Sequence, residues 1–172
     1  MNENQGVYWL AVAAITADVS YEELKHRMVI ANGWPALNLE SLLSFADAEN
    51  REAFDAIFSA LFKRAYPDGD AAPVARVFFD LLQLKNGDLI VAIEGTRVVG
   101  ITELKVDAIS TYRHDAYHEY ANAFCYGSVW IDWATVSSEF APVAPAKGVK
   151  GIKRLQQDRE KVLAAWNTYK NR

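Results

Sequence analysis

The segment from Leu84 to Trp133 constrains the fold more than any other part of the chain. It contains two strand-like runs, Asp88–Ile93 and Arg97–Val106, which the tight turn Glu94-Gly95-Thr96 joins. A third strand-like run, Ser128–Trp133, follows after a long stretch rich in aromatic residues and histidines. This pattern predicts a β-hairpin with a returning strand and one oversized loop between them. Loops longer than about 12 residues in a compact domain are usually functional, so we expect the site to be built around that loop.

The rest of the chain mixes one further strand with several helices. Val7–Ala14 is a near-continuous apolar run, which favours a buried strand in the interior of a sheet. Ser20 can cap a following helix because Glu23 lies three residues further on, and Asn32-Gly33 is a typical C-cap pair. Apolar spacing and end signals predict five helical segments: Tyr21–Ala31, Leu39–Phe45, Asn50–Tyr66, Ala72–Leu82 and Gln156–Tyr169. We expect Val136–Gly148 to be irregular and Gly151-Ile152 to add an edge strand. This order predicts a mixed α+β fold over residues 1–172 as one domain.

Composition and charge narrow the setting of the protein. The chain is 51% hydrophobic and 23% charged, which is ordinary for a soluble globular protein. The single cysteine, Cys125, cannot form an internal disulfide, so we expect a reducing cytoplasm. Val7–Ile15 is too short to span a bilayer, so no membrane partner is expected.

The charge is unevenly distributed along the sequence. The net charge of −4 argues against a nucleic-acid partner, but residues 146–172 carry eight basic and two acidic side chains. That end is therefore +6 and the remainder is −10. A basic C-terminal helix at about 155–170 on an acidic body points weakly to a polyanion, and a solvated helix explains it equally well.

No catalytic or metal site is predicted. His114 and His118 have a spacing that suits two ligands on one helix face, but no third ligand is evident and the adjacent glutamate follows the second histidine. Cys125 lies between Phe124 and Tyr126, which indicates core rather than an activated thiol. We therefore expect a non-catalytic binding domain without a cofactor.

The aromatic side chains are the more informative group. Seven of them lie between Thr111 and Trp133. In one interpretation they are packing residues. In the other, rings stack on a planar ligand while nearby cations meet its phosphates; the candidates are Tyr112, Tyr117, Tyr120 and Trp34 for the rings, and Arg113, His114 and His118 for the cations. Composition alone favours packing.

An ordered set of motifs resembles the PUA-like superfamily. The set comprises an opening YWL, then ANGWPALNLESL after the first helix, GDLIVAIEG with VVGITE in the hairpin, the tyrosine-rich loop, and the final V-x-I-x-W. The chain is most similar to the EVE/YTH-like branch found at the N-terminus of McrB-type and other modification-dependent restriction proteins. The resemblance covers roughly Tyr8 to Trp133. It implies a small β-barrel, flanked by helices, that binds nucleic acid.

The resemblance also implies a site. Relatives extrude a modified base and hold it in an aromatic pocket, which agrees with the physics of base recognition. Trp34 corresponds to the cage tryptophan, with Asn32 and Gly33 at the mouth of the pocket. The resemblance implies that the tyrosines of the long loop form the other wall of the pocket: Tyr112, Tyr117 and Tyr120. Trp9 is expected in the core.

The chain departs from the family pattern before the final strand. Many relatives have a His/Arg cluster there, and this chain has Cys125-Tyr126-Gly127-Ser128. Phosphate contacts are then expected from the basic tail or from four side chains elsewhere: Lys105, Arg113, His114 and His118.

Three functional hypotheses follow from these observations. The first is a DNA-binding module that reads a modified base and serves as the specificity domain of a restriction or defence system, with a GTPase or nuclease effector as partner. The second is an RNA- or nucleotide-binding PUA-like domain without DNA specificity. The third, an enzyme acting on a nucleobase, would need a nucleophile or metal set that the sequence does not offer.

Overall fold

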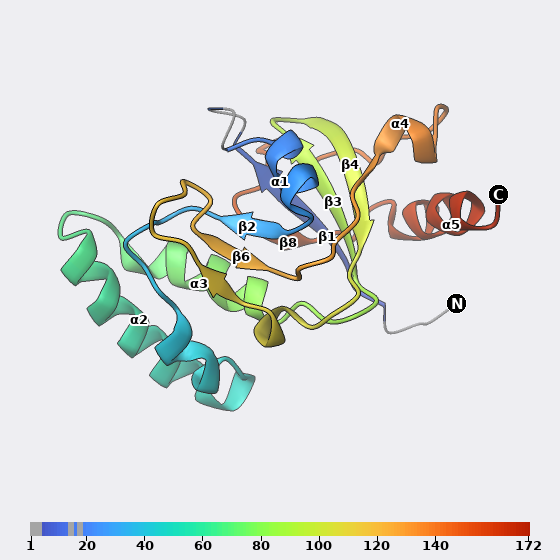
Figure 1. Ribbon diagram of the computed structural model, residues 1–172. Coiled ribbons are helices and arrows are strands. Elements are labelled where there is room, and N and C mark those ends of the chain that lie inside the picture. The colour runs from blue at the N-terminus through green and yellow to red at the C-terminus, as the bar shows by residue number, and fades with distance from the viewer. Residues whose placement is uncertain (1–4, 14–15, 17–18) are drawn as a thin grey trace.

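The fold is built on two β-sheets with helices around them (Figure 1). The computed structural model describes residues 5–13, 16 and 19–172. The larger sheet has the order β7-β4-β3-β1-β8, with β1 (Val7–Val12), β3 (Leu89–Glu94), β4 (Arg97–Glu103), β7 (Ile131–Asp132) and β8 (Ile152–Arg154). The smaller sheet has the order β2-β6-β5, with β2 (Ile30–Asn32), β5 (Arg113–His114) and β6 (Asn122–Phe124). The α+β class is confirmed. The expected barrel is wrong, because the sheets of the described residues do not close on themselves.

The larger sheet contains the predicted hairpin. β3 and β4 pair antiparallel across a turn in which Gly95 has φ 62°, a conformation that glycine adopts without strain. β1 pairs parallel with β3 and antiparallel with β8, so the predicted interior position of β1 and the predicted edge strand are both confirmed. Ala14, the last residue of the predicted first strand, lies outside the described residues.

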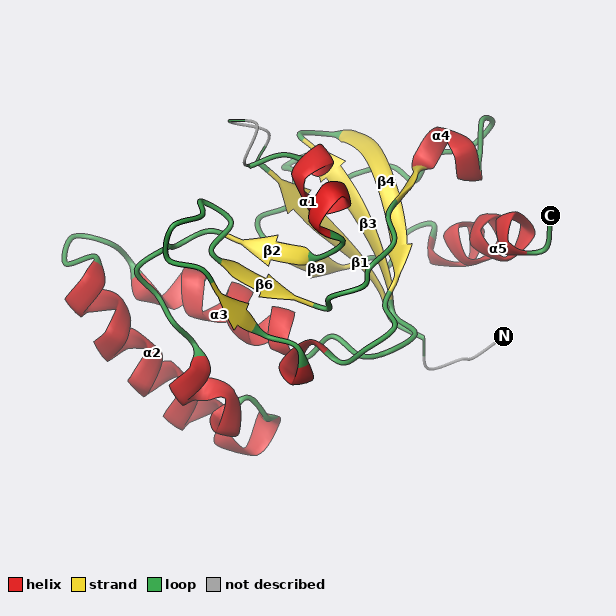
Figure 2. Cartoon of the chain, in the orientation of Figure 1, coloured by secondary structure: helices red, strands yellow, loops and turns green. Residues whose placement is uncertain are grey.

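Each face of the larger sheet packs against its own core. Alternate side chains of β3 point to opposite faces. Leu89, Val91 and Ile93 join the core under α4 (Trp133–Val136) and α5 (Arg159–Lys170). Ile90 and Ala92 join the core that contains α1 (Tyr21–Arg27), α2 (Arg51–Ala65) and α3 (Ala71–Leu82). Figure 2 shows α2 and α3 on one side of the sheet and α5 on the other. Cover on both faces explains why β3 is apolar at every position from Leu89 to Ile93.

The helices follow their apolar spacing closely. Phe54, Phe58 and Phe62 form the buried stripe of α2, and short 3₁₀ helices (Glu40–Phe45, Ala48–Asn50 and Ala108–Ser110) flank the longer elements. In α5, Val162, Leu163 and Trp166 are buried as predicted. Trp9 lies in the core, also as predicted. No helix in the described ranges is both long and apolar enough to cross a membrane.

The first helix ends earlier than its sequence suggests. It stops at Arg27, with Met28 in the left-handed region at φ 53°, so the predicted helix to Ala31 and the C-cap at Asn32-Gly33 are wrong. Val29 and Ile30 are fully buried, and Ile30 pairs with Phe124 of β6. These β-branched residues suit a strand, and their burial against β6 decides the local structure.

The long segment after β4 is also more ordered than predicted. Instead of one irregular loop, it supplies β5 and β6, which together with β2 make the smaller sheet. The returning strand is shorter than expected: only Ile131–Asp132 pair with β4, because Trp133 begins α4.

Candidate functional site

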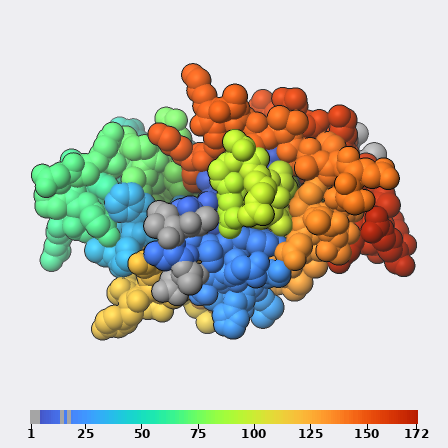
Figure 3. Space-filling view, turned by 90° about the horizontal axis from the view of Figure 1, so that it is seen from above, coloured from blue at the N-terminus to red at the C-terminus, as the bar shows by residue number. Residues whose placement is uncertain are grey.

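A cavity of about 570 Å³ opens at the end of the larger sheet where β1 and β3 both terminate. We call it the strand-end pocket. Its lining comes from five stretches of chain: Ala11–Ala13 with Val19, Ala31–Gly33, Ile93 with Gly95, Glu119 with Tyr120, and Gly148–Gly151. Carboxyl ends of neighbouring parallel strands are a common place for ligands, and the volume is that of a small-molecule site. Figure 3 looks onto this end, where the β3–β4 turn and the segment before β8 meet the region of α1.

The wall of the pocket combines apolar surface with one free amide. Ala13, Val19 and Val149 supply accessible apolar surface, and the buried residues Val12, Ala31 and Ile93 lie behind it. The carboxamide of Asn32 is half-buried and has no hydrogen-bond partner in the part of the chain that the structure describes. A carboxamide both donates and accepts hydrogen bonds, so it can pair with the polar edge of a planar ligand.

Tyr120 forms another part of the wall. Its side chain is buried, and that burial raises the pKa of its hydroxyl to about 12, so the ring is neutral at physiological pH. The backbone of Ala13, at the end of β1, hydrogen-bonds the hydroxyl. The ring is therefore held at a fixed place beside the ends of the strands.

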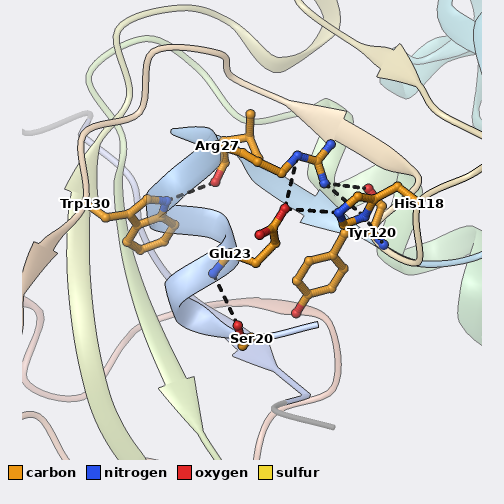
Figure 4. Close-up of polar contacts among 7 residues, drawn as sticks. Ser20, Glu23, Arg27, His118, Tyr120 and Trp130 are labelled. Carbon is orange, nitrogen blue, oxygen red and sulfur yellow. Dashed lines mark hydrogen bonds and ion pairs between the residues drawn. The ribbon is translucent and has the colours of Figure 1, made fainter. Parts of the chain in front are cut away.

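A polar network fixes this wall to α1 (Figure 4). The backbone N–H of Tyr120 donates to Nδ1 of His118 over 2.9 Å, so this ring nitrogen is an acceptor. Nε2 of His118 must then carry the proton that it donates to Glu23 Oε1 over 3.0 Å. Arg27 lies 3.2 Å from the same Nδ1 and donates to the carbonyl of Tyr120 over 3.1 Å. His118 and Arg27 therefore position the pocket wall, and both ring nitrogens of His118 are already engaged.

Trp34 lies next to the pocket in sequence but faces elsewhere. Its ring packs edge-to-face on Phe62 and Tyr66, with centroid distances of 5.3 and 5.0 Å. The residue has φ 65°, which turns the chain between Gly33 in the pocket lining and the Trp34 ring against α2. The predicted cage tryptophan is thus a packing residue of the second helix in this structure.

The other two predicted ring residues also lie outside the lining. The Tyr112 hydroxyl donates to Asn122 Oδ1 over 2.6 Å and accepts from the Leu39 N–H over 2.8 Å. Burial raises the pKa of Tyr112 to about 12, and the ring braces the smaller sheet. Tyr117 is fully exposed. Of the six residues predicted for the base pocket, the structure brings together Asn32, Gly33 and Tyr120.

The predicted phosphate ligands do not converge on the pocket. Lys105 follows the far end of β4 and pairs with Glu103 over 3.1 Å. The guanidinium of Arg113 lies over the ring of Tyr126, 4.6 Å from its centroid. His114 Nε2 lies 2.8 Å from the carbonyl of Pro35. With His118 engaged by Glu23, these four side chains have separate surroundings.

One cation of the predicted basic tail, Lys150, lies at the pocket. Lys150 lines the pocket, and further exposed basic residues lie before it and after it in the sequence, the latter in β8. We call this set the basic strip; it consists of Lys147, Lys150, Lys153 and Arg154. Among the described residues none of the four forms an ion pair. The cations of α5 differ, since Lys161 and Lys170 pair with Asp158 and Glu103. The basic tail was evident from composition, but its cations without an ion-pair partner in the described residues include all four of the basic strip, which precede α5.

Other candidate chemistry is engaged in packing. Cys125 is fully buried, and that burial raises the pKa of its thiol to about 12, as expected for a core residue rather than a nucleophile. In the described residues no cluster of three or more His, Cys, Asp or Glu side chains could hold a metal ion.

Comparison with known proteins found no similar protein. No family model, no curated protein and no solved structure matches this chain. The function is therefore argued from the strand-end pocket and the basic strip.

Proposed function

We propose that this chain is a PUA-like, EVE/YTH-type reader that holds one modified base of a nucleic acid in the strand-end pocket. The observation that carries the proposal is the unpartnered carboxamide of Asn32 in an otherwise largely apolar cavity beside the neutral ring of Tyr120. Such a combination suits an uncharged, planar ligand with a polar edge. An extruded nucleobase has that chemistry, and extrusion is how proteins reach a single base.

Asn32 supplies the polar recognition. Asparagine can donate and accept side by side, as it does in bidentate contacts to adenine. A contact of this type discriminates against a wrong base by about 1–3 kcal/mol. The accessible apolar side chains of the lining, such as Ala13, Val19 and Val149, can contact an added methyl group, which suits a modified base.

The basic strip supplies the path for the phosphates. Lys150 lies in the pocket lining, and Lys153 and Arg154 follow along the edge strand β8 toward the opposite end of the sheet. Cations without carboxylate partners can neutralise phosphates and release counterions. Each phosphate contact that the strip makes would add about −0.9 to the salt slope for duplex DNA.

The proposed role is recognition without catalysis. A domain of this kind would act as the specificity element of a modification-dependent restriction or defence system, with a GTPase or nuclease as effector. The chemistry of the pocket supports this role, because its polar side chains are suited to binding: an amide, a neutral phenol, one ammonium and the carboxylate of Glu119 at the rim.

A titration with matched duplexes tests the proposal. The duplexes are unmodified, or carry N6-methyladenine, 5-methylcytosine or 5-hydroxymethylcytosine, and each is measured at two salt concentrations. We expect one modified duplex to bind at least tenfold more tightly than the unmodified one. Asn32→Ala should abolish that preference, while Asn86→Ala at the opposite end of the sheet should retain it.

Two outcomes of this titration would contradict the proposal. Equal, salt-sensitive binding to all duplexes would mean a non-specific DNA-binding domain. No binding to any duplex would remove DNA as the ligand.

A second candidate keeps the pocket and changes the ligand to RNA or a free nucleotide. The observation that favours it is the acidic body together with the exposed carboxylate of Glu119 at the rim, which disfavours a long duplex there. Binding that is insensitive to salt would distinguish a small ligand, because phosphate contacts along a strand impose a steep salt dependence.

A further inference from the structure

Tyr117 is the most exposed large apolar side chain in the described part of the chain. Its relative exposure is 102%, so the ring touches nothing else in the molecule. The next most exposed large hydrophobic residue, Val143, reaches 66%. An aromatic ring that contributes nothing to packing is available for a partner.

The turn that carries Tyr117 is built by specific hydrogen bonds. The Tyr117 N–H donates to Asp115 Oδ1 over 3.0 Å, and the Asp115 N–H donates to the Ala121 carbonyl over 2.8 Å. The next residue, His118, is held by Glu23 and Arg27 of α1. The ring is therefore presented from a fixed base, which lowers the entropy lost on binding.

The position of the turn relates it to the pocket. Glu119 and Tyr120, two and three residues further on, line the strand-end pocket. An extended chain spans at most about 3.6 Å per residue, so the Cα of Tyr117 lies within roughly 7 Å of that of Glu119 and 11 Å of that of Tyr120. Figure 3 shows the β5–β6 connection, in amber, projecting beside the region of α1. At this distance the Tyr117 side chain can contact the bases next to one that is held in the pocket.

We propose that Tyr117 stacks on the base next to the extruded one and fills the gap that extrusion leaves. This inference rests on the proposed function. Extruding a base loses stacking, and an inserted side chain or an aromatic platform restores part of it. The exposed carboxylates of Asp115 and Glu119 flank the turn and disfavour a phosphate there, so the contact is ring on base.

The test compares Tyr117→Ala with Tyr117→Phe, which keeps the ring. The probes are duplexes with N6-methyladenine or 5-methylcytosine beside a 2-aminopurine, and the corresponding free modified nucleosides. We expect Tyr117→Ala to bind its duplex about 5- to 150-fold more weakly, the range that corresponds to one stacked base. The wild type and Tyr117→Phe should quench 2-aminopurine fluorescence, and Tyr117→Ala should not. Nucleoside affinity should change less than twofold, because the nucleoside has no neighbour to stack.

The outcomes separate this inference from the proposed function. If Tyr117→Ala binds duplex as tightly as the wild type while the nucleoside still binds, the stacking role is wrong and the pocket proposal stands. If duplex and nucleoside affinities fall equally, the ring belongs to the pocket itself and the neighbouring-base role is overturned. If the wild type binds neither probe, both proposals fall. Because the side chain has no contacts, none of these results can arise from misfolding of the core.

Discussion

At the scale of single residues, neighbours in the sequence have different roles in the structure. Asn32 and Gly33 line the strand-end pocket, while the ring of Trp34, the next residue, packs on α2. The resemblance to known readers predicted all three as one unit. A motif fixes which residues are adjacent in the chain, but the backbone dihedral at Trp34 decides where its side chain points.

Trp34→Ala should therefore lower stability before it affects recognition. The variant loses the edge-to-face contacts with Phe62 and Tyr66 and leaves a void beside α2, which costs about 2–3 kcal/mol for a half-buried ring. Alanine keeps a Cβ, so the strain of the positive φ is unchanged. Urea unfolding measures the loss, and Trp34→Phe is the control that should retain most of the stability. If Trp34→Ala kept its stability but lost ligand binding, the Trp34 ring would contact the ligand and the packing role would be wrong.

At the scale of elements, periodic segments were predictable and short paired segments were not. α2, α3 and α5 carry apolar side chains at helical spacing, and the β3–β4 hairpin has an evident turn. β2, β5 and β6 have only two or three residues each, too few for a period to be visible. β2 depends on pairing with β6, some 90 positions further along the chain, which no local pattern reveals.

One carboxylate joins α5 to the sheet. Glu103 of β4 accepts from the Trp166 indole and from the Lys170 ammonium, each over 2.8 Å, and also pairs with Lys105. Burial alone would raise the pKa of this carboxyl, but the hydrogen bonds from Lys170, Trp166 and Lys105 outweigh it and lower the pKa to about 2. The lowered pKa makes the contact sensitive to acid.

The stability that Glu103 provides should disappear as the pH falls from about 4.5 to about 2. Its pKa is lower in the folded chain than the ordinary value of 4.5, so the stabilisation is fully present above pH 4.5. After allowance for solvent screening we expect a loss of about 1–2 kcal/mol. Urea unfolding at pH 7, 4 and 2.5 measures it. Glu103→Gln should be less stable at pH 7 and should lack this part of the pH dependence; an unchanged pH profile would contradict the assignment.

At the scale of the whole molecule, the two ends of the larger sheet differ in chemistry. The strand-end pocket is mainly apolar and has Lys150 of the basic strip in its lining, whereas a cavity of about 530 Å³ at the opposite end is polar and includes Tyr8, Asp88 and Arg154. The sequence indicated a basic tail and an acidic body but not their arrangement. The pairing of β8 with β1, a long-range contact between the two ends of the chain, places Lys153 and Arg154 along the edge of the sheet.

The most direct test of the account is to locate ligand binding by NMR. Amide resonances of the protein are recorded with N6-methyladenosine and with 5-methylcytidine added separately. We predict that one of them shifts the Asn32 side-chain amide and the backbone amides of Gly33, Tyr120 and Gly151. Shifts gathered around Tyr8 and Asp88 would place the ligand at the wrong end of the sheet. That result, or an Asn32 resonance unmoved by either nucleoside, would contradict the claim that the strand-end pocket holds a modified base.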